Sequence, residues 1–155
     1  MIVIDCDFLS SFLKIDKLDL IKKFYKVNKV YITAAVLNEL SKTALINKLP
    51  DWLEVIPTTL EKELITIKDF NKLGEGEKSC IMLAKKENAL FLVSDNKARQ
   101  VAQWIGVTVV NIPAFLLSCK KVSLLSTNEI EEIIEELDKK NHYKFRQDQK
   151  KRLLE

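Results

Sequence analysis

Four acidic residues stand where strand-like segments end or helix-like segments begin: Asp5, Glu39, Glu77 and Asp95. Residues 1–5 and 90–95 share one pattern, a short β-branched and aromatic run that closes on an acid and leads into a helix-forming stretch. Such runs are typical of buried strands in a parallel sheet. Because functional residues of open parallel sheets collect beyond the carboxyl ends of the strands, we expect Asp5 and Asp95 to be placed for chemistry.

Carboxylates that share one pocket raise each other's pKa values unless a cation neutralises them. Mg²⁺ and Mn²⁺ bind carboxylate and water oxygens and keep positions open for a substrate phosphate. Such ions activate water for attack on a phosphodiester and stabilise the leaving oxygen. The acids therefore indicate metal-dependent hydrolysis of a nucleic-acid backbone. The one histidine, His142, lies in the C-terminal tail, which excludes a histidine-rich nuclease site and disfavours a serine or cysteine triad.

The segments that carry these acids alternate between strand and helix patterns. Strands are predicted at residues 1–5, 29–33, 54–57, 90–94 and 107–110. Helices are predicted at residues 8–13, 18–27, 34–40, 79–86, 96–105 and 126–140, whereas the stretch up to residue 73 has no decided pattern. This alternation predicts an α/β fold with a parallel sheet and right-handed crossovers.

Composition bounds the class of protein. The 155 residues are 47% hydrophobic and 30% charged, which predicts a single domain over 1–155, with a core at 1–112 and C-terminal helices and a basic tail at 113–155. A net charge of +3 does not indicate nucleic-acid binding by bulk charge. With no leader and no membrane-spanning stretch visible, we expect a soluble, cytoplasmic protein without membrane contact. Three cysteines without C-x-x-C spacing are expected to be reduced core residues.

The C-terminal part contains two further features. In the helix predicted at 126–140, Thr127 is the expected cap, and the apolar stripe is formed by Ile130, Ile133, Ile134 and Leu137. This helix and the apolar segment 112–118 are candidate surfaces for a dimer or a partner protein. The tail mixes Lys144 and Arg146 with Tyr143 and Phe145, so it could bind RNA or dock as a surface helix.

Four segments resemble the PIN domain family, the nuclease domain of VapC-type toxins in toxin–antitoxin pairs. They are Val3–Asp5, Ile32–Leu40, Leu73–Ala84 and Leu92–Arg99, and their order and spacing agree with that family over residues 1–112. The resemblance implies a three-layer α/β/α fold with a central parallel sheet of about four to five strands. It also implies an endoribonuclease with Mg²⁺ or Mn²⁺, an RNA substrate, a homodimer and a restraining antitoxin.

Carried over residue by residue, the resemblance makes Asp5 and Asp95 metal ligands, with Glu39 and Glu77 completing the catalytic site. Glu77 matches the family spacing better than Glu75 does.

Two positions depart from the family pattern. Asp7 stands where relatives have a hydroxyl or amide residue, and could be an additional ligand or an N-cap. Asn96 stands where many relatives have another acid, so it could bind metal through its amide oxygen or open a helix.

Alternatives remain open at this level. Lys97 and Arg99 could bind an RNA phosphate or form a solvated helix face. Trp52 and Trp104 are expected to be core or interface anchors. A catalytically weak PIN-like module that binds RNA or a protein is the alternative function. A phosphoacceptor receiver domain fits less well, because the middle and late strands lack its aspartate and lysine.

Overall fold

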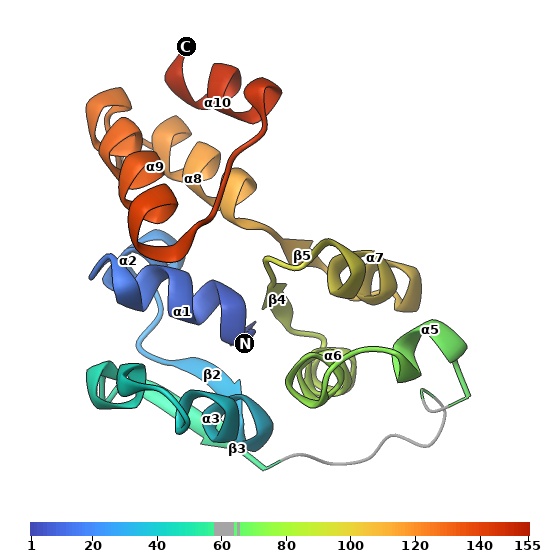
Figure 1. Ribbon diagram of the computed structural model, residues 1–155. Helices are drawn as coiled ribbons and strands as arrows, with labels where there is room; N and C mark the ends of the chain where they lie inside the picture. The colour runs from blue at the N-terminus through green and yellow to red at the C-terminus, as the bar shows by residue number, and fades with distance from the viewer. Residues whose placement is uncertain (58–63, 65) are drawn as a thin grey trace.

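Five parallel strands form one sheet, in the order β3-β2-β1-β4-β5, among the residues that the computed structural model describes (Figure 1). Those residues are 1–57, 64 and 66–155. In the register, Val3 lies opposite Tyr31 on one side and Phe91 on the other. The strands are β1 (Ile2–Ile4), β2 (Val30–Thr33), β3 (Leu53–Ile56), β4 (Leu90–Leu92) and β5 (Val109–Val110). The predicted parallel sheet is confirmed.

The strand order contains a switch point between β1 and β4. From β1 the chain continues to β2 and β3 on one side, and then returns to the other side of β1 to form β4 and β5. Loops that follow strands on either side of such a point diverge and leave a crevice at the carboxyl edge of the sheet. The loops after β1 and β4 are the ones that contain Asp5 and Asp95.

Helices cover both faces of the sheet. They are α1 (Cys6–Lys14), α2 (Asp19–Tyr25), α3 (Ala34–Leu40), the 3₁₀ helix η1 (Ala44–Lys48), α5 (Lys68–Asn71), α6 (Glu75–Glu87), α7 (Asn96–Ile105), α8 (Ile112–Lys121), α9 (Thr127–Asn141) and α10 (Gln147–Leu154). The fold is thus the expected three-layer α/β/α arrangement.

One layer is joined by aromatic packing among α1, α2 and α8. The rings of Phe8, Phe12 and Phe24 surround Phe115 with centroid distances of 5.6–6.0 Å. The other layer consists mainly of α6 and α7, and α6 packs on β1, β2 and β4. Helix α3 contacts both α1 and α6, so its C-terminal end lies near the crevice.

The C-terminal region is part of the same hydrophobic core. The stripe of α9 is buried within the chain, as are Phe115, Phe145 and Leu153. The apolar sides of α8 and α9 are therefore used internally, and a partner at these helices would have to contact their charged outer sides. Residues 147–154 of the tail form a helix, α10, that packs on α8 and α9.

Three sequence predictions need correction or fall outside the description. Ser126, not Thr127, caps α9, through a bond of 3.2 Å from the Glu129 N–H to its Oγ. Trp104 is 75% exposed and is not a core residue, whereas Trp52 is half-buried beneath the Lys22 ammonium. Seven residues of the undecided stretch that ends at residue 73, namely 58–63 and 65, lie outside the described residues, and its later part contains α5. No helix in the described part of the chain is long and apolar enough to cross a membrane.

Candidate functional site

Asp5 begins the site at the end of β1. Its backbone N–H donates to the Leu92 carbonyl at 3.0 Å, which continues the β1–β4 ladder by one residue. Its side chain then caps α1, because Oδ1 accepts the Phe8 N–H at 2.8 Å. Only 1% of Asp5 is exposed, so its charge is placed deep in the crevice.

Asp95 has the matching position after β4. Its Oδ1 accepts the Ala98 N–H at 2.9 Å and caps α7, and the residue is half-buried. Capping and site formation are therefore not competing interpretations of these two acids. Each uses one oxygen to cap a helix at the switch point, and the cap fixes where the carboxylate lies.

Glu39 and Glu77 approach from α3 and α6. Glu39 Oε1 accepts the Gly76 N–H at 3.2 Å, so the last turn of α3 is joined to the first turn of α6. Glu77 Oε1 accepts the Gly74 N–H at 3.2 Å in a capping box. Its Oε2 is buried and has no hydrogen-bond partner within the described residues. Glu75, by contrast, is exposed and pairs with Lys78 at 2.8 Å.

Gly76 is a positioning residue that sequence reasoning missed. A Cβ atom at Gly76 would collide with Oε1 of Glu39 and would lie 3.2 Å from its Cδ. Glu39 can therefore cross over α6 only because residue 76 lacks a side chain. The sequence signal was present in Gly74-Glu75-Gly76-Glu77, but the pattern indicated no more than a turn before a helix.

Thr33 and Ser79 join the same two helices below the acids. Their hydroxyl oxygens lie 2.6 Å apart and both residues are buried. Thr33 also caps α3 through the Val36 N–H, and Ser79 donates to the Gly76 carbonyl at 2.7 Å. These bonds set the separation of α3 and α6, and hence that of Glu39 and Glu77.

The acids influence one another electrostatically. Burial raises the pKa of Asp5 well above its usual range, and the charges of Asp7 and Glu77 raise it further, although N–H groups of Phe8 and Ser94 lower it. Burial likewise raises the pKa of Glu77, and the charges of Asp95, Asp7 and Glu39 add to that effect. Glu77 is thus coupled to every other acid of the cluster.

Asp7 belongs to this cluster, and its capping alternative is wrong. Asp5 caps α1, whereas Asp7 is exposed in the first turn of that helix. Although Asp7 contacts solvent, partial removal of its carboxylate from water, followed by the charges of Asp95 and Glu39, raises its pKa. Asn96 opens α7 as its first residue, with Asp95 as the cap, and its Oδ1 accepts from the Arg99 guanidinium at 3.3 Å.

The donor set fits a hard divalent cation. All the side chains are carboxylates, and their mutual repulsion calls for positive charge. In the part of the chain that the structure describes, the buried Glu77 Oε2 also has no hydrogen-bond partner. Across residues 1–57, 64 and 66–155, however, no three acidic, histidine or cysteine side chains lie close enough together to hold a metal ion. Each of the four acids instead has one carboxylate oxygen bound to a backbone N–H group.

A thiol nucleophile is disfavoured at this site. Cys6 adjoins the acids, and burial followed by the charge of Glu39 raises its pKa to about 12. A thiol with that pKa stays protonated at neutral pH.

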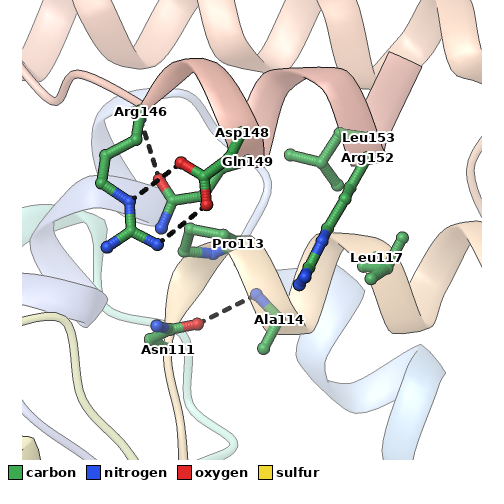
Figure 2. Close-up of a pocket in the computed structure, with 9 residues that line it drawn as sticks. All are labelled: Asn111, Pro113, Ala114, Leu117, Arg146, Asp148, Gln149, Arg152 and Leu153. Atoms are coloured by element: carbon green, nitrogen blue, oxygen red, sulfur yellow. Dashed lines mark hydrogen bonds and ion pairs between the residues drawn. The ribbon is translucent and has the colours of Figure 1, made fainter. Parts of the chain in front are cut away.

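The basic candidates occupy different places. Arg99 lies near the acids through its contact with Asn96, whereas Lys97 lines a separate surface pocket with Trp104. Lys144 pairs with Asp138 at 3.0 Å. Figure 2 shows Arg146 bound to Asp148 at the edge of a pocket between α8 and α10, which none of the four acids lines.

Comparison with known proteins agrees with this geometry. A family model, DUF3368, described as a PIN domain, matches residues 1–154. No curated protein matches the chain. PIN domains are generally nucleases that use divalent metals. Because the match covers nearly the whole sequence and the fold agrees with it, the chain belongs to the PIN domain family.

Proposed function

We propose that this protein is a metal-dependent endoribonuclease that hydrolyses RNA phosphodiester bonds with Mg²⁺ or Mn²⁺. The observation that carries the proposal is the electrostatic coupling of carboxylates from four elements near the β1/β4 switch point, including a buried Glu77 oxygen that has no hydrogen-bond partner among the residues described. Asp5 and Asp95 would hold the cation, with Glu39 and Glu77 completing the site. When bound, the cation would lower the pKa of water and neutralise charge on the phosphate.

The side chains have distinct roles in this proposal. Asp5 is fixed by its cap and provides a rigid buried charge. Glu77 has an oxygen available to orient the attacking water and to accept its proton. Arg99 is placed to bind a phosphate oxygen of the bound strand.

The test is cleavage of a mixed single-stranded RNA pool by the purified protein with Mn²⁺, Mg²⁺ or chelator. We expect metal-dependent cleavage that falls at least about a hundredfold in an Asp5→Asn, Asp95→Asn double variant. Glu75→Gln is the matched control for Glu77→Gln, because Glu75 lies two residues away but faces solvent. Equal cleavage by Glu77→Gln and wild type would contradict the assigned role.

The proposed biological role is the toxin of a toxin–antitoxin pair, acting in the cytoplasm as a homodimer restrained by an antitoxin. It follows from the VapC-like segments of the sequence. Induced expression should arrest bacterial growth for the wild type and not for the double variant. Undisturbed growth despite active, soluble enzyme would favour a processing or defence role.

One observation favours a second function, a catalytically weak module that binds RNA or a protein. Asn96 replaces an acid of the family pattern, and its amide oxygen is occupied by Arg99. This alternative predicts RNA binding without cleavage in any metal, and the same cleavage assay separates the two.

A further inference from the structure

A cavity of about 340 Å³ adjoins the acidic cluster on its α1 side. Among the residues that line it are Asp7 and Ser94, which adjoin the cluster, and Lys14, Asn141, His142 and Tyr143. Its volume lies within the range of about 300–1,000 Å³ that small-molecule sites occupy. The proposed phosphodiester chemistry leaves this cavity without a role.

The outer wall is built by contacts between the two ends of the chain. Lys14 Nζ donates to Asn141 Oδ1 at 2.7 Å, and Asn141 Nδ2 donates to Ser11 Oγ at 2.7 Å. These bonds hold the C-terminal end of α9 on α1, as Figure 1 shows for the turn after α9. His142 then takes a left-handed conformation, with φ of 51°, and turns the chain along the cavity.

Tyr143 is fixed before any ligand arrives. Its N–H donates to the Leu137 carbonyl at 3.0 Å, and its ring packs edge-on against Phe145 with centroids 5.0 Å apart. Burial raises the pKa of the Tyr143 hydroxyl, and the charges of Arg99 and Arg146 partly offset that rise. Tyr143 and Lys14 line the same cavity, and an ordered aromatic ring together with a cation is the combination that binds a base and its phosphate in single-stranded nucleic acid.

We propose that this cavity is the subsite for the RNA nucleotide next to the scissile phosphate, an inference that rests on the proposed nuclease function. Tyr143 stacks on the base, while Lys14 and Arg99 bind the flanking phosphates. The phosphate that reacts lies over Asp5, Asp95 and Glu77, beyond Asp7 and Ser94. The C-terminal segment thus contributes substrate binding to a site whose acids all lie in the first 95 residues.

The test measures binding and cleavage separately. Fluorescence anisotropy with a labelled single-stranded RNA gives Kd in an Asp95→Asn background with Mn²⁺ present, and cleavage by otherwise wild-type protein gives kcat and KM. Tyr143→Leu should raise Kd at least about fivefold. Lys14→Gln should raise Kd about two- to fivefold by loss of one phosphate contact. Lys17→Gln, whose position lies outside the cavity, is the matched control that should leave Kd unchanged.

The outcomes separate this proposal from the nuclease function. A raised KM with unchanged kcat for Tyr143→Leu and Lys14→Gln supports the subsite, because it marks lost binding that is not specific to the transition state. Cleavage with Kd and KM unchanged in both variants would overturn the subsite and leave the nuclease intact. Binding that depends on Tyr143 and Lys14 without any cleavage would reject the nuclease and keep a nucleotide site. If Tyr143→Leu lowers Tm, the Kd and KM of Lys14→Gln decide whether the subsite exists. If the parent protein binds no RNA, the proposal is overturned.

Discussion

At the scale of single residues, each acid of the site has a structural role as well as a proposed chemical one. Asp5, Asp95, Glu39 and Glu77 each accept a backbone N–H with one carboxylate oxygen. These bonds position the groups at a cost, because the charges are brought together and partly removed from water. The metal-free protein should therefore be less stable than the same fold with the charge removed.

Asp5→Asn tests this cost. Asn retains an oxygen that can accept the Phe8 N–H but has no charge, so we expect a higher Tm for the metal-free variant at pH 7. Each unit by which folding raises a pKa corresponds to about 1.4 kcal/mol. A stabilisation of that size raises Tm by roughly 3–6 °C for a chain of this length. Differential scanning calorimetry with chelator present checks the expectation, with Glu75→Gln as the exposed control.

The pH dependence of stability has a definite sign. Folding raises the pKa of Asp5 and Glu77, so the folded state binds these protons more tightly than the unfolded state. Stability of the metal-free protein should fall as pH rises from the usual carboxylate range through the raised values. Asp5→Asn should flatten this dependence. If Tm changes by the same amount between pH 4 and pH 8 in Asp5→Asn and in the wild type, this explanation of the pH dependence is contradicted.

Gly76 provides a third prediction at this scale. Gly76→Ala should push the Glu39 carboxylate away from α6, since the added Cβ would collide with it. We expect Mn²⁺ affinity and cleavage to fall about 10- to 100-fold, the usual effect of disturbing groups that orient metal ligands. Gly74→Ala is the matched control, because its Cβ would lie 3.4 Å from Glu77 Oε1. Isothermal titration with Mn²⁺ checks the affinity, and equal losses in both variants would count against this explanation.

At the scale of elements, the sequence predicted what short-range patterns determine. Apolar runs ending on Asp5 and Asp95 identified β1 and β4, and the parallel alternation implied that the two acids meet at one edge. Short-range patterns did not show that α3 reaches the crevice, because the bond between Glu39 and Gly76 joins residues 37 positions apart. For the tail, a docked surface helix was only one of two alternatives and had no bounds, because the sequence of α10 is mostly polar and only Leu153 in it is buried.

The contact between α3 and α6 can be tested through Thr33. Thr33→Val keeps the shape of the side chain but removes the cap to Val36 and the hydroxyl contact with Ser79. Loss of a buried cap and hydrogen bond should lower the free energy of unfolding by about 1–3 kcal/mol. Thr43, which caps the exposed η1, is the control, and Thr43→Val should cost less than about 1 kcal/mol. Urea denaturation gives both values, and similar losses would contradict the special role of Thr33.

At the scale of the whole molecule, the site depends on chain segments that are distant in sequence. The acids come from α3, α6 and the ends of β1 and β4, whereas the wall of the adjoining cavity comes from the end of α9. The expectation of a single domain over 1–155 consequently bears on function. If the C-terminal helices unfolded independently, the cavity would open while the acids stayed together.

Neighbouring leucines in α10 test whether the chain unfolds as one unit. Leu153 is 1% exposed and Leu154 is 36% exposed, so Leu153→Ala should lower the free energy of unfolding by about 2–4 kcal/mol, and Leu154→Ala by less than about 1 kcal/mol. The fluorescence of Trp52 and Trp104, which belong to other parts of the fold, reports unfolding outside α10. In a single cooperative unit, Leu153→Ala shifts the fluorescence transition and the circular dichroism transition equally. If Leu153→Ala leaves the fluorescence transition unchanged but helical signal is lost at lower denaturant or temperature, the C-terminal helices form a separate unit. RNA affinity would then fall before the acidic site is disrupted.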